Sequence, residues 1–342
     1  MQKERMTIHD IAKLAGVSAS AVSIVLNDRP GVSDATRSHI KKIIRSNNYT
    51  PNLNSRKLIL NKSFNIFIVA DHRAGEGAFD DMFYNSAIMG ALSRCGEVGY
   101  NLVLCDILQE YASSTLKQAV DQHNVDGVIF LQNIRAEVAE ELTRAAMPFV
   151  VLDSHKQKSG YPCICCDYAD ASAKAVSYLI KTGHKQIAFI GNSSVHEFYI
   201  STFNGYMGAL EKHGIPCCPS LATSAEVNFE SINQAIGRLL KSEIKPDAIF
   251  CAADLMAIFA MQSLAMRGIS IPEQISVCAV DNILPSQLSV PPLTTVDIAK
   301  NRMGTEAVDM LMDMIEGKND INFRRCIPTG EVLVRNTVIN RS

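Results

Sequence analysis

Thr7-Ile8-His9-Asp10-Ile11-Ala12-Lys13-Leu14-Ala15-Gly16-Val17-Ser18 is the stretch that decides how the start of this chain folds. Its apolar residues recur at the spacing of one helical face, and they are Ile8, Ile11, Ala12 and Ala15. Thr7 is a favourable N-cap for this helix, and Gly16 allows the backbone conformation of a tight turn. Ser18 can then cap a second short helix that ends near Asn27. The stretch therefore predicts two short helices at a sharp angle, the pattern of a helix-turn-helix.

A third helix is predicted after the chain break at Pro30-Gly31, with Ser33 as its N-cap. The apolar face of this helix is formed by Ile40, Ile43 and Ile44. Three short helices with a shared apolar face predict a small all-α domain over residues 1–50. In helix-turn-helix domains the second helix enters the DNA major groove, whereas an ordinary helical hairpin is the structural alternative.

Charge is distributed unevenly along the 342 residues of the chain. Residues 1–63 contain 11 Lys/Arg and 4 Asp/Glu, a net charge of +7, and the remainder carries −9. A basic first segment suits contact with DNA phosphates. The sequence contains no apolar run near the ~18 residues that a membrane span needs, and its start lacks the apolar segment of a signal peptide. We therefore expect a cytoplasmic protein that does not contact a membrane.

From Phe64 onward, short apolar runs alternate with helical segments. Strands are predicted over residues 64–70, 101–106, 127–131, 149–153, 186–190, 248–251 and 275–279, with a last strand around 331–339. Helices are predicted over residues 83–98, 113–123, 136–145, 169–181, 205–213, 231–241 and 255–267. Two such series predict an α/β body over residues 64–342, built as two doubly wound parallel-sheet lobes. Ligands bind at the carboxyl ends of such strands, here in the cleft between the lobes.

Several motifs match a known family position by position. In the first segment they are Val17-Ser18, Val22-Ser23, Val25-Leu26-Asn27, Gly31-Val32-Ser33, Thr36-Arg37 and Tyr49-x-Pro51-Asn52. In the body they include Val125-Asp126-Gly127-Val128-Ile129, Asn204-Gly205-Tyr206, Asp254-Leu255-Met256-Ala257 and Pro291-Pro292-Leu293-Thr294-Thr295-Val296. The chain thus resembles, over essentially its whole length, the lactose/galactose repressor family of bacterial transcriptional regulators. That resemblance implies a DNA-binding head joined to a sensor with the fold of periplasmic sugar-binding proteins.

The resemblance also implies which residues contact DNA. The positions that face bases match Ala19, Ser20 and Ile24. Candidates for phosphate contacts are Ser18, Ser23, Asn27, Ser33, Thr36 and Arg37, and further DNA-binding candidates are Thr7, Tyr49, Asn52, Ser55 and Arg56. Ile24 stands where the family often has an arginine, and isoleucine can make only apolar contact, for instance with a thymine methyl group. We therefore expect an operator without the guanine that the family usually prefers there.

Residues 51–63 are the predicted hinge helix and linker. Pro51 suits the first turn of a helix, with Thr50 as its cap. In the family, two hinges pair in the minor groove and a leucine, here Leu58, wedges into a base step. The alternative is a frayed linker. The implied partners are therefore double-stranded DNA with a palindromic operator and a second copy of this chain, because a two-fold operator calls for a homodimer.

The resemblance implies that the chain crosses three times between its lobes. Lobe one is expected over about 64–164 and 296–325, and lobe two over about 165–293 and 326–342. Dimer contacts are expected from about 82–98, 109–118 and 280–288.

The expected effector site departs from the family's sugar sites. Its candidate residues are Phe79, Phe83, Asp153, Phe198, Thr202, Ala253 and Asp281. Thr202 replaces an arginine and Ala253 replaces an asparagine of the sugar-responsive relatives. Three interpretations stay open: a different small neutral ligand, a sugar held by other residues, or a vestigial pocket with control by a partner protein.

The chain has ten cysteines, among them the clusters Cys163-Ile164-Cys165-Cys166 and Cys217-Cys218. Zinc sites need further Cys or His in a second knuckle, so we expect free buried thiols rather than a metal site, with thiol sensing as the alternative. His184 is expected to be structural. No cofactor is expected, and no catalytic motif is found. The competing classes are a sugar-binding protein without a DNA role and an α/β enzyme.

Overall fold

The computed structural model describes residues 6–26, 30–47, 49, 62–71, 82–107, 110–154, 160–318 and 322–342. The chain divides into two compact units, Met1–Phe64 and Asn65–Ser342, which we name the head and the body. Six candidate residues lie outside the described residues, as does nearly all of the predicted hinge: Asn27, Asn52, Ser55, Arg56, Leu58 and Phe79.

The head consists of α1 (Ile8–Ala15), α2 (Ala19–Leu26) and α3 (Asp34–Ser46), as predicted. A capping box starts α1: the Thr7 hydroxyl accepts the Asp10 N–H at 3.4 Å, and the Asp10 carboxylate accepts the Thr7 N–H at 2.8 Å. Gly16 ends α1 with φ 63°, a left-handed conformation that glycine adopts without strain. α1 and α2 are bent by 105° relative to each other, within the range of a helix-turn-helix.

A single apolar cluster holds the three head helices together. Its buried members are Ile11, Ala12, Ala15, Val22, Val25, Ile40 and Tyr49. Ile43 and Ile44 pack against this cluster while remaining half-buried. The head is therefore a small domain whose core contains the residues that the helical spacing predicted.

The described residues of the body form two sheets of six strands each. The sheet of lobe one has the order β11-β5-β4-β3-β1-β2. Its strands are β1 (Asn65–Asp71), β2 (Asn101–Ile107), β3 (Gly127–Leu131), β4 (Phe149–Leu152), β5 (Cys163–Cys166) and β11 (Arg324–Ile327). The sheet of lobe two has the order β12-β10-β9-β8-β6-β7. Its strands are β6 (Ile187–Asn192), β7 (Ala222–Ala225), β8 (Ala248–Cys251), β9 (Ser276–Asp281), β10 (Thr294–Asp297) and β12 (Val332–Leu333).

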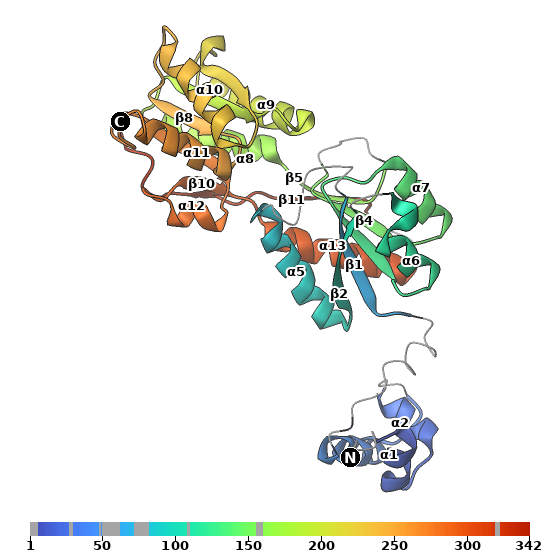
Figure 1. Cartoon of the computed structure of the whole chain (residues 1–342). Coiled ribbons are helices and arrows are strands. Elements are labelled where there is room, and N and C mark those ends of the chain that lie inside the picture. Colours follow the sequence, from blue (N-terminus) through green and yellow to red (C-terminus); the bar gives the residue numbers. More distant parts are fainter. Residues whose placement is uncertain are drawn as a thin grey trace. The chain divides into compact units, whose positions relative to one another are not determined.

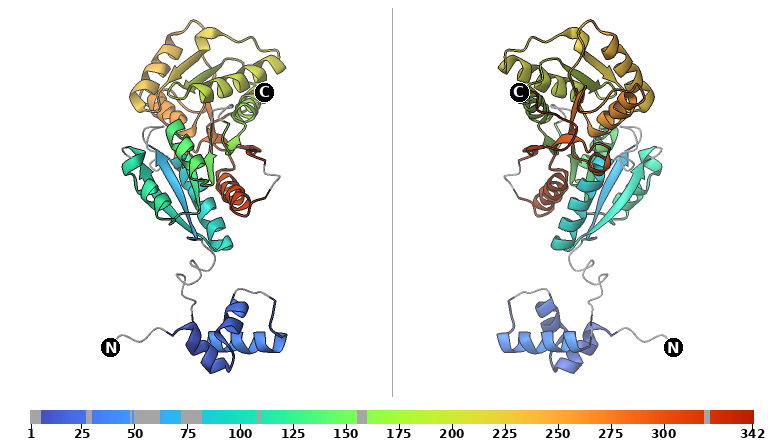
Figure 2. Two further views of the ribbon diagram at one scale, coloured as in Figure 1. Left: turned by 90° about the vertical axis from the view of Figure 1, so that its right-hand side faces the viewer. Right: turned by 90° about the vertical axis from the view of Figure 1, so that its left-hand side faces the viewer.

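The strands pair in parallel except for β12, which is antiparallel to β10. The helices of lobe one are α5 (Met82–Val98), α6 (Thr115–Asp121), α7 (Ala136–Arg144) and α13 (Lys300–Ile315). Those of lobe two are α8 (Tyr168–Lys181), α9 (His196–Lys212), α10 (Phe229–Lys241), α11 (Asp254–Ala265) and α12 (Leu284–Leu288). Figures 1 and 2 show helices on both faces of each sheet, the doubly wound architecture that the sequence predicted.

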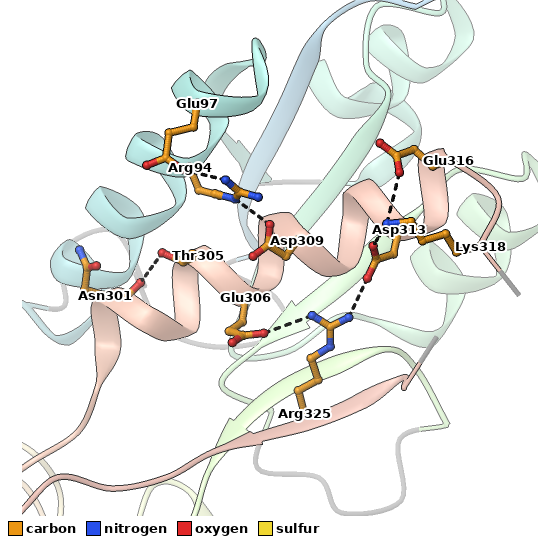
Figure 3. A network of polar contacts seen from close by, with 10 residues as sticks. All are labelled: Arg94, Glu97, Asn301, Thr305, Glu306, Asp309, Asp313, Glu316, Lys318 and Arg325. Atoms are coloured by element: carbon orange, nitrogen blue, oxygen red, sulfur yellow. Dashed lines mark hydrogen bonds and ion pairs between the residues drawn. The ribbon is translucent and has the colours of Figure 1, made fainter. Parts of the chain in front are cut away.

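The two helices on one face of the first sheet, α5 and α13, approach each other closely. A Cβ on Gly304 would lie 1.9 Å from the Ala87 carbonyl oxygen, so only glycine permits this contact. Ion pairs tie α13 to its neighbours (Figure 3): Arg94 of α5 pairs with Asp309 at 2.7 Å, and Arg325 of β11 pairs with Asp313 at 2.9 Å. The opposite face of the sheet is covered by α6 and α7.

In the order of the described strands, the chain passes from one sheet to the other three times. It leaves the first sheet after Cys166, returns to it after Asp297, and leaves it again after Ile327. Each lobe is therefore built from separate segments of the sequence.

Several elements differ from the sequence predictions. The helices α12 and α13 and the strands β7, β10 and β11 were not predicted, and α9 begins at His196 instead of residue 205. The first turns of α9 are rich in aromatic and β-branched residues, and burial on one face overrides their weak helix propensity. The last strand is shorter than predicted. It consists only of Val332–Leu333, which pairs with Thr295 and Val296 of β10.

No single helix of the described residues is long and apolar enough to span a membrane. The helices α1 and α2 together reach the length and apolar content of a membrane span, but they are bent by 105° relative to each other.

Candidate nucleic-acid interface and sensor site

The second head helix presents a neutral, mostly small face. Ser20 is exposed, whereas Ala19, Ser23 and Ile24 are half-buried. The side chain of Ile24 lies beside Gly31, where a glycine Cβ would meet its Cδ1 at 3.4 Å. α2 carries no charged residue. Any base reading by this helix would therefore use small polar or apolar contacts rather than a guanidinium group.

Two of the residues predicted to contact phosphate begin helices. The Ser18 hydroxyl accepts the Ala21 N–H at 3.2 Å, and the Ser33 hydroxyl accepts the Thr36 N–H at 3.2 Å. A hydroxyl that accepts a hydrogen bond keeps its own proton for donation, and helix N-termini attract anions. Both roles, cap and phosphate contact, are therefore compatible at these positions.

The other described head candidates differ in exposure. Thr7 is exposed at the start of α1, and Thr36 and Arg37 are half-buried on α3. Tyr49 is only 9% exposed and packs into the head core, where desolvation raises its pKa. The sequence did not predict that Tyr49 is chiefly a core residue, although its apolar ring is the signal that could have shown it.

In the body, Asp153 is the centre of a buried polar cluster. One carboxylate oxygen accepts the Tyr84 hydroxyl at 2.8 Å, and the other accepts the Tyr168 hydroxyl at 2.7 Å. Phe83 packs edge-on against Tyr84, and Phe198 packs edge-on against Tyr168. Burial raises the pKa of Tyr168 well above its ordinary value, so this hydroxyl remains a donor. Asp153, Phe83 and Phe198 thus lie in one cluster, together with two tyrosines that were not predicted as site residues.

Thr202 and Ala253 mark the departures from the sugar-responsive pattern. Thr202 is fully buried, and its hydroxyl donates to the backbone carbonyls of Phe198 at 2.9 Å and Tyr199 at 3.1 Å. Ala253 is the N-cap residue of α11 and makes no side-chain cap bond. The Thr202 hydroxyl therefore donates its proton within its own helix, and the Ala253 side chain has no hydrogen-bonding group.

Asp281 ends β9 with φ 131°, an unusual conformation for a residue other than glycine. Its carboxylate accepts the backbone N–H of Asp254 at 3.3 Å. Asp254 is itself fully buried, and its carboxylate accepts the Thr295 hydroxyl at 2.5 Å and the Ile283 N–H at 3.0 Å. Desolvation raises the pKa of Asp254 to about 6. The sequence placed Asp254 in a family motif without giving it a role.

Lys300 links this polar cluster to lobe one. Its ammonium group donates to the backbone carbonyl of Asp281 and, at 3.2 Å, to that of Ile298. It also lies 5.7 Å from the centre of the Phe83 ring, a cation–π distance. The candidate residues Phe83 and Asp281, far apart in sequence, are therefore joined by one lysine that is only 4% exposed.

Among the described residues, no group of three His, Cys, Asp or Glu side chains could hold a metal ion. Cys163, Cys165 and Cys166 are buried, whereas Cys217 and Cys218 are half-buried. The His184 ring contacts the Ser276 hydroxyl at 2.8 Å and the Leu179 carbonyl at 3.0 Å, and burial lowers its pKa. His184 is therefore part of the packing of lobe two, as predicted.

Comparisons with known proteins agree along the whole chain. The profile of bacterial regulatory proteins of the lacI family matches residues 7–52, and that of the periplasmic binding protein-like domain matches residues 176–338. The HTH-type transcriptional repressor PurR of Vibrio atlanticus is 30% identical over 317 residues, covering 92% of this chain and 93% of the relative. The repressor CytR of Escherichia coli K12 is 28% identical over 320 residues, covering 93% of this chain and 92% of that relative.

Two solved structures extend this likeness to three dimensions. The transcriptional regulator CelR in complex with cellobiose is 27% identical, with a TM-score of 0.70, covering 97% of this chain and 100% of that chain. The lac repressor dimer bound to operator and the anti-inducer ONPF is 24% identical, with a TM-score of 0.74, covering 98% and 100%, and it shows the same fold. The chain therefore belongs to the LacI family of bacterial regulatory proteins, transcriptional regulators that join a helix-turn-helix head to a periplasmic-binding-protein-like body.

Proposed function

We propose that this regulator is a cytoplasmic, dimeric repressor that binds a palindromic operator in double-stranded DNA. A small, neutral, sugar-like molecule bound between the lobes would switch its operator affinity. The observation that carries the proposal is the capped helix pair of the head, bent by 105°, on the same chain as a two-lobed body. A sugar-binding protein without a DNA role would not need this head, and the family assignment makes the competing enzyme class unnecessary.

Exposed apolar side chains support the predicted dimer surface. On α5, Met82, Met89 and Leu92 are 48%, 58% and 46% exposed, at helical spacings of seven and three residues. On and after α12, Leu284, Leu288 and Val290 are 66%, 71% and 94% exposed. Clusters of exposed apolar side chains are typical of protein interfaces. Both clusters fall within or beside the segments predicted for dimer contacts, residues 82–98 and 280–288.

The chemistry of the described sensor residues favours a neutral effector. The cluster around Asp153 offers aromatic rings and carboxylate oxygens, which suit hydroxyl-bearing or ring-shaped molecules better than anions. The cellobiose complex of CelR is a precedent for a sugar in such a body. The pairing of Asp153 with two tyrosines equally supports the alternative of a vestigial pocket, with a partner protein as the regulator.

Selection of binding sites from random duplex DNA by the full chain would test DNA recognition. We expect enrichment of a two-fold symmetric sequence, and enrichment of no sequence would contradict the proposal. A thermal-shift screen of sugars, nucleosides and other small metabolites would test the sensor, because a ligand that binds only the folded state raises the melting temperature. A hit must also change operator affinity in a gel shift. If no compound does so, a partner protein becomes the preferred regulator.

Leu58 tests the hinge, which lies outside the described residues. If Leu58 wedges into a base step, Leu58→Ala should weaken binding to the selected operator strongly and binding to unrelated DNA little. Asn54→Ala, in the same segment, is the control for any general effect of alanine there. Equal losses on both DNAs would contradict the wedge assignment.

A further inference from the structure

Three cysteines from two distant segments meet on one face of the first sheet. β5 and β11 pair in parallel, with Cys163 opposite Arg324 and Cys165 opposite Cys326. Facing residues of a parallel pair point to the same side of the sheet, and alternate residues of a strand share a face. Cys163, Cys165 and Cys326 therefore lie on one side, opposite to Arg325, which pairs with Glu306 and Asp313 of α13 (Figure 3).

The three thiols lie near one another and differ in exposure. Cys165 lies between the other two, because it shares β5 with Cys163 and faces Cys326 on β11, and its thiol donates to the backbone carbonyl of Arg325 at 3.7 Å. Cys163 and Cys165 are only 1% and 5% exposed, whereas Cys326 is exposed on β11, the edge strand. Cys163 packs in the apolar cluster under α6 and α7, and Cys326 lies beyond the edge of that cluster. A solvent-borne reagent therefore reaches the group through Cys326.

We propose that Cys326 and Cys165 form a reversible oxidation site, in which an oxidant such as hydrogen peroxide links them in a cross-strand disulfide. Neighbouring strands lie about 4.8 Å apart, and disulfides span Cα separations of about 4.4–6.8 Å. The bond is therefore within reach, although facing positions on parallel strands strain it. Strained disulfides are readily reduced, which fits a reversible modification better than a permanent structural bond.

The oxidation balances in two steps. The Cys326 thiolate attacks one peroxide oxygen, the O–O bond breaks, and the products are a sulfenic acid on Cys326 and hydroxide. That hydroxide is neutralised to water by the proton that Cys326 released when it ionised. The Cys165 sulfur then attacks the Cys326 sulfur, the S–O bond breaks, and hydroxide leaves. The Cys165 proton passes to the Cys163 thiolate, its neighbour on β5, and from there neutralises the hydroxide as water. Two thiols have lost two electrons, and the peroxide has been reduced to two waters.

The pKa shifts of the thiols bear on which one accepts a proton and which one reacts with peroxide. Cys165 and the nearby Arg324 lower the pKa of Cys163 to about 7, so part of this thiol is ionised at neutral pH and can accept the Cys165 proton as the sulfur–sulfur bond forms. Cys163 and burial raise the pKa of Cys165, so Cys165 attacks as a thiol that loses its proton during the reaction. Burial and the nearby Cys165 and Asp167 raise the pKa of Cys326 to about 11, while Arg324 opposes this shift. The first step should therefore be slow at neutral pH, and the reaction is best followed at mildly alkaline pH.

The proposed disulfide would lie where the chain passes between the two lobes of the body. β5 ends at Cys166, just before the chain enters α8 of lobe two, and β11 ends at Ile327, just before it passes to β12. The disulfide would thus join two of the three connections between the lobes at the point where they leave lobe one. We expect slower hydrogen exchange in residues 163–168 and 324–333 of the oxidised protein.

The test uses the full chain, fully reduced and then treated with hydrogen peroxide. Remaining thiols are blocked with N-ethylmaleimide, and peptide mapping by mass spectrometry identifies the links. We expect a Cys165–Cys326 link that dithiothreitol reverses and that Cys326→Ser abolishes. Cys326 is exposed, so this variant should fold normally. Cys163→Ser should slow the link without removing it, whereas a pure packing role for Cys163 would leave the rate unchanged.

The matched control is Cys218→Ser. Cys218 is half-buried in lobe two, and its hydrogen bond with Ser220 lowers its pKa, so it competes for any thiol reagent. The Cys165–Cys326 link should persist in this variant. A protein in which only Cys217 or Cys218 is oxidised, or in which Cys326 alone is oxidised without a partner, would overturn the proposal.

Discussion

At the scale of single residues, the reading face of the head depends on Ile24. Its side chain is half-buried beside Gly31, and it offers a base pair only apolar contact. Ile24→Arg should create a preference for guanine at the base pair it faces, worth about 1–3 kcal/mol for a bidentate contact. Binding-site selection with both proteins measures this preference. Ile24→Val is the control, because it keeps an apolar side chain and should leave the selected sequence unchanged. An unchanged sequence with Ile24→Arg would show that this residue does not face a base.

Asp254 should make stability depend on pH. Its pKa is raised from 3.8 to about 6 by desolvation, so the folded protein binds this proton more tightly than the unfolded chain. Its stabilising effect is therefore fully present below about pH 4 and is lost as pH rises to about 6, by on the order of 3 kcal/mol. Denaturant unfolding of wild type and Asp254→Asn across this window measures the difference. If the free-energy difference between the two proteins does not change with pH, the carboxyl group is not desolvated in this way.

At the scale of elements, the N-cap of α3 is a local contact between Ser33 and Thr36. Ser33→Ala removes the hydroxyl that accepts the Thr36 N–H, and it should destabilise α3 by about 1 kcal/mol. Thermal unfolding of the head, followed by far-ultraviolet circular dichroism, measures this loss. Ser38→Ala makes the same substitution at an exposed position inside α3, where alanine should be neutral or slightly stabilising. An equal loss in both variants would exclude the cap as the cause.

The contact between α5 and α13 depends on glycine. A Cβ at Gly304 would lie 1.9 Å from the Ala87 carbonyl oxygen, so Gly304→Ala must push the two helices apart, at a cost of about 1–3 kcal/mol or more. Gly96→Ala is the matched control, because a Cβ at Gly96 of α5 meets no atom within 4 Å. That control should be stabilising by up to about 1 kcal/mol, since alanine favours helix. Differential scanning calorimetry compares the two, and a neutral Gly304→Ala would mean that the helices pack less tightly than described.

Some strands and helices could be predicted from the sequence and others could not. Buried runs such as residues 127–131 predicted their strand to the residue, because a strand covered on both faces has a continuous apolar sequence. α13 was not predicted, although Met303, Ala307 and Leu311 recur at helical spacing. In the sensor site, Asp153 was predicted, but Tyr84 and Tyr168 were not. They reach Asp153 from 69 and 15 residues away, a proximity that only the folded sheet creates.

At the scale of the whole molecule, the remaining question is assembly. A dimer binds both half-sites of a two-fold operator at once, because it carries two heads. A variant that no longer dimerises should therefore also lose operator affinity. Met89 is 58% exposed on α5, on the side opposite to Ala87 and Gly90, which are buried against α13. A charge at this position would be desolvated in the proposed dimer but not in a monomer.

Met89→Glu should therefore shift the protein to a monomer in sedimentation velocity, and it should weaken binding to the palindromic operator at least tenfold. Binding to a single half-site should change little, because one head suffices for it. Met266→Glu is the control: Met266 is 69% exposed after α11, outside the segments predicted for dimer contacts, and the same charge there should leave the sedimentation coefficient unchanged. Since neither methionine is buried, neither substitution should affect the melting temperature of the monomer. A Met89→Glu protein that remains dimeric and binds the operator normally would move the dimer surface away from α5.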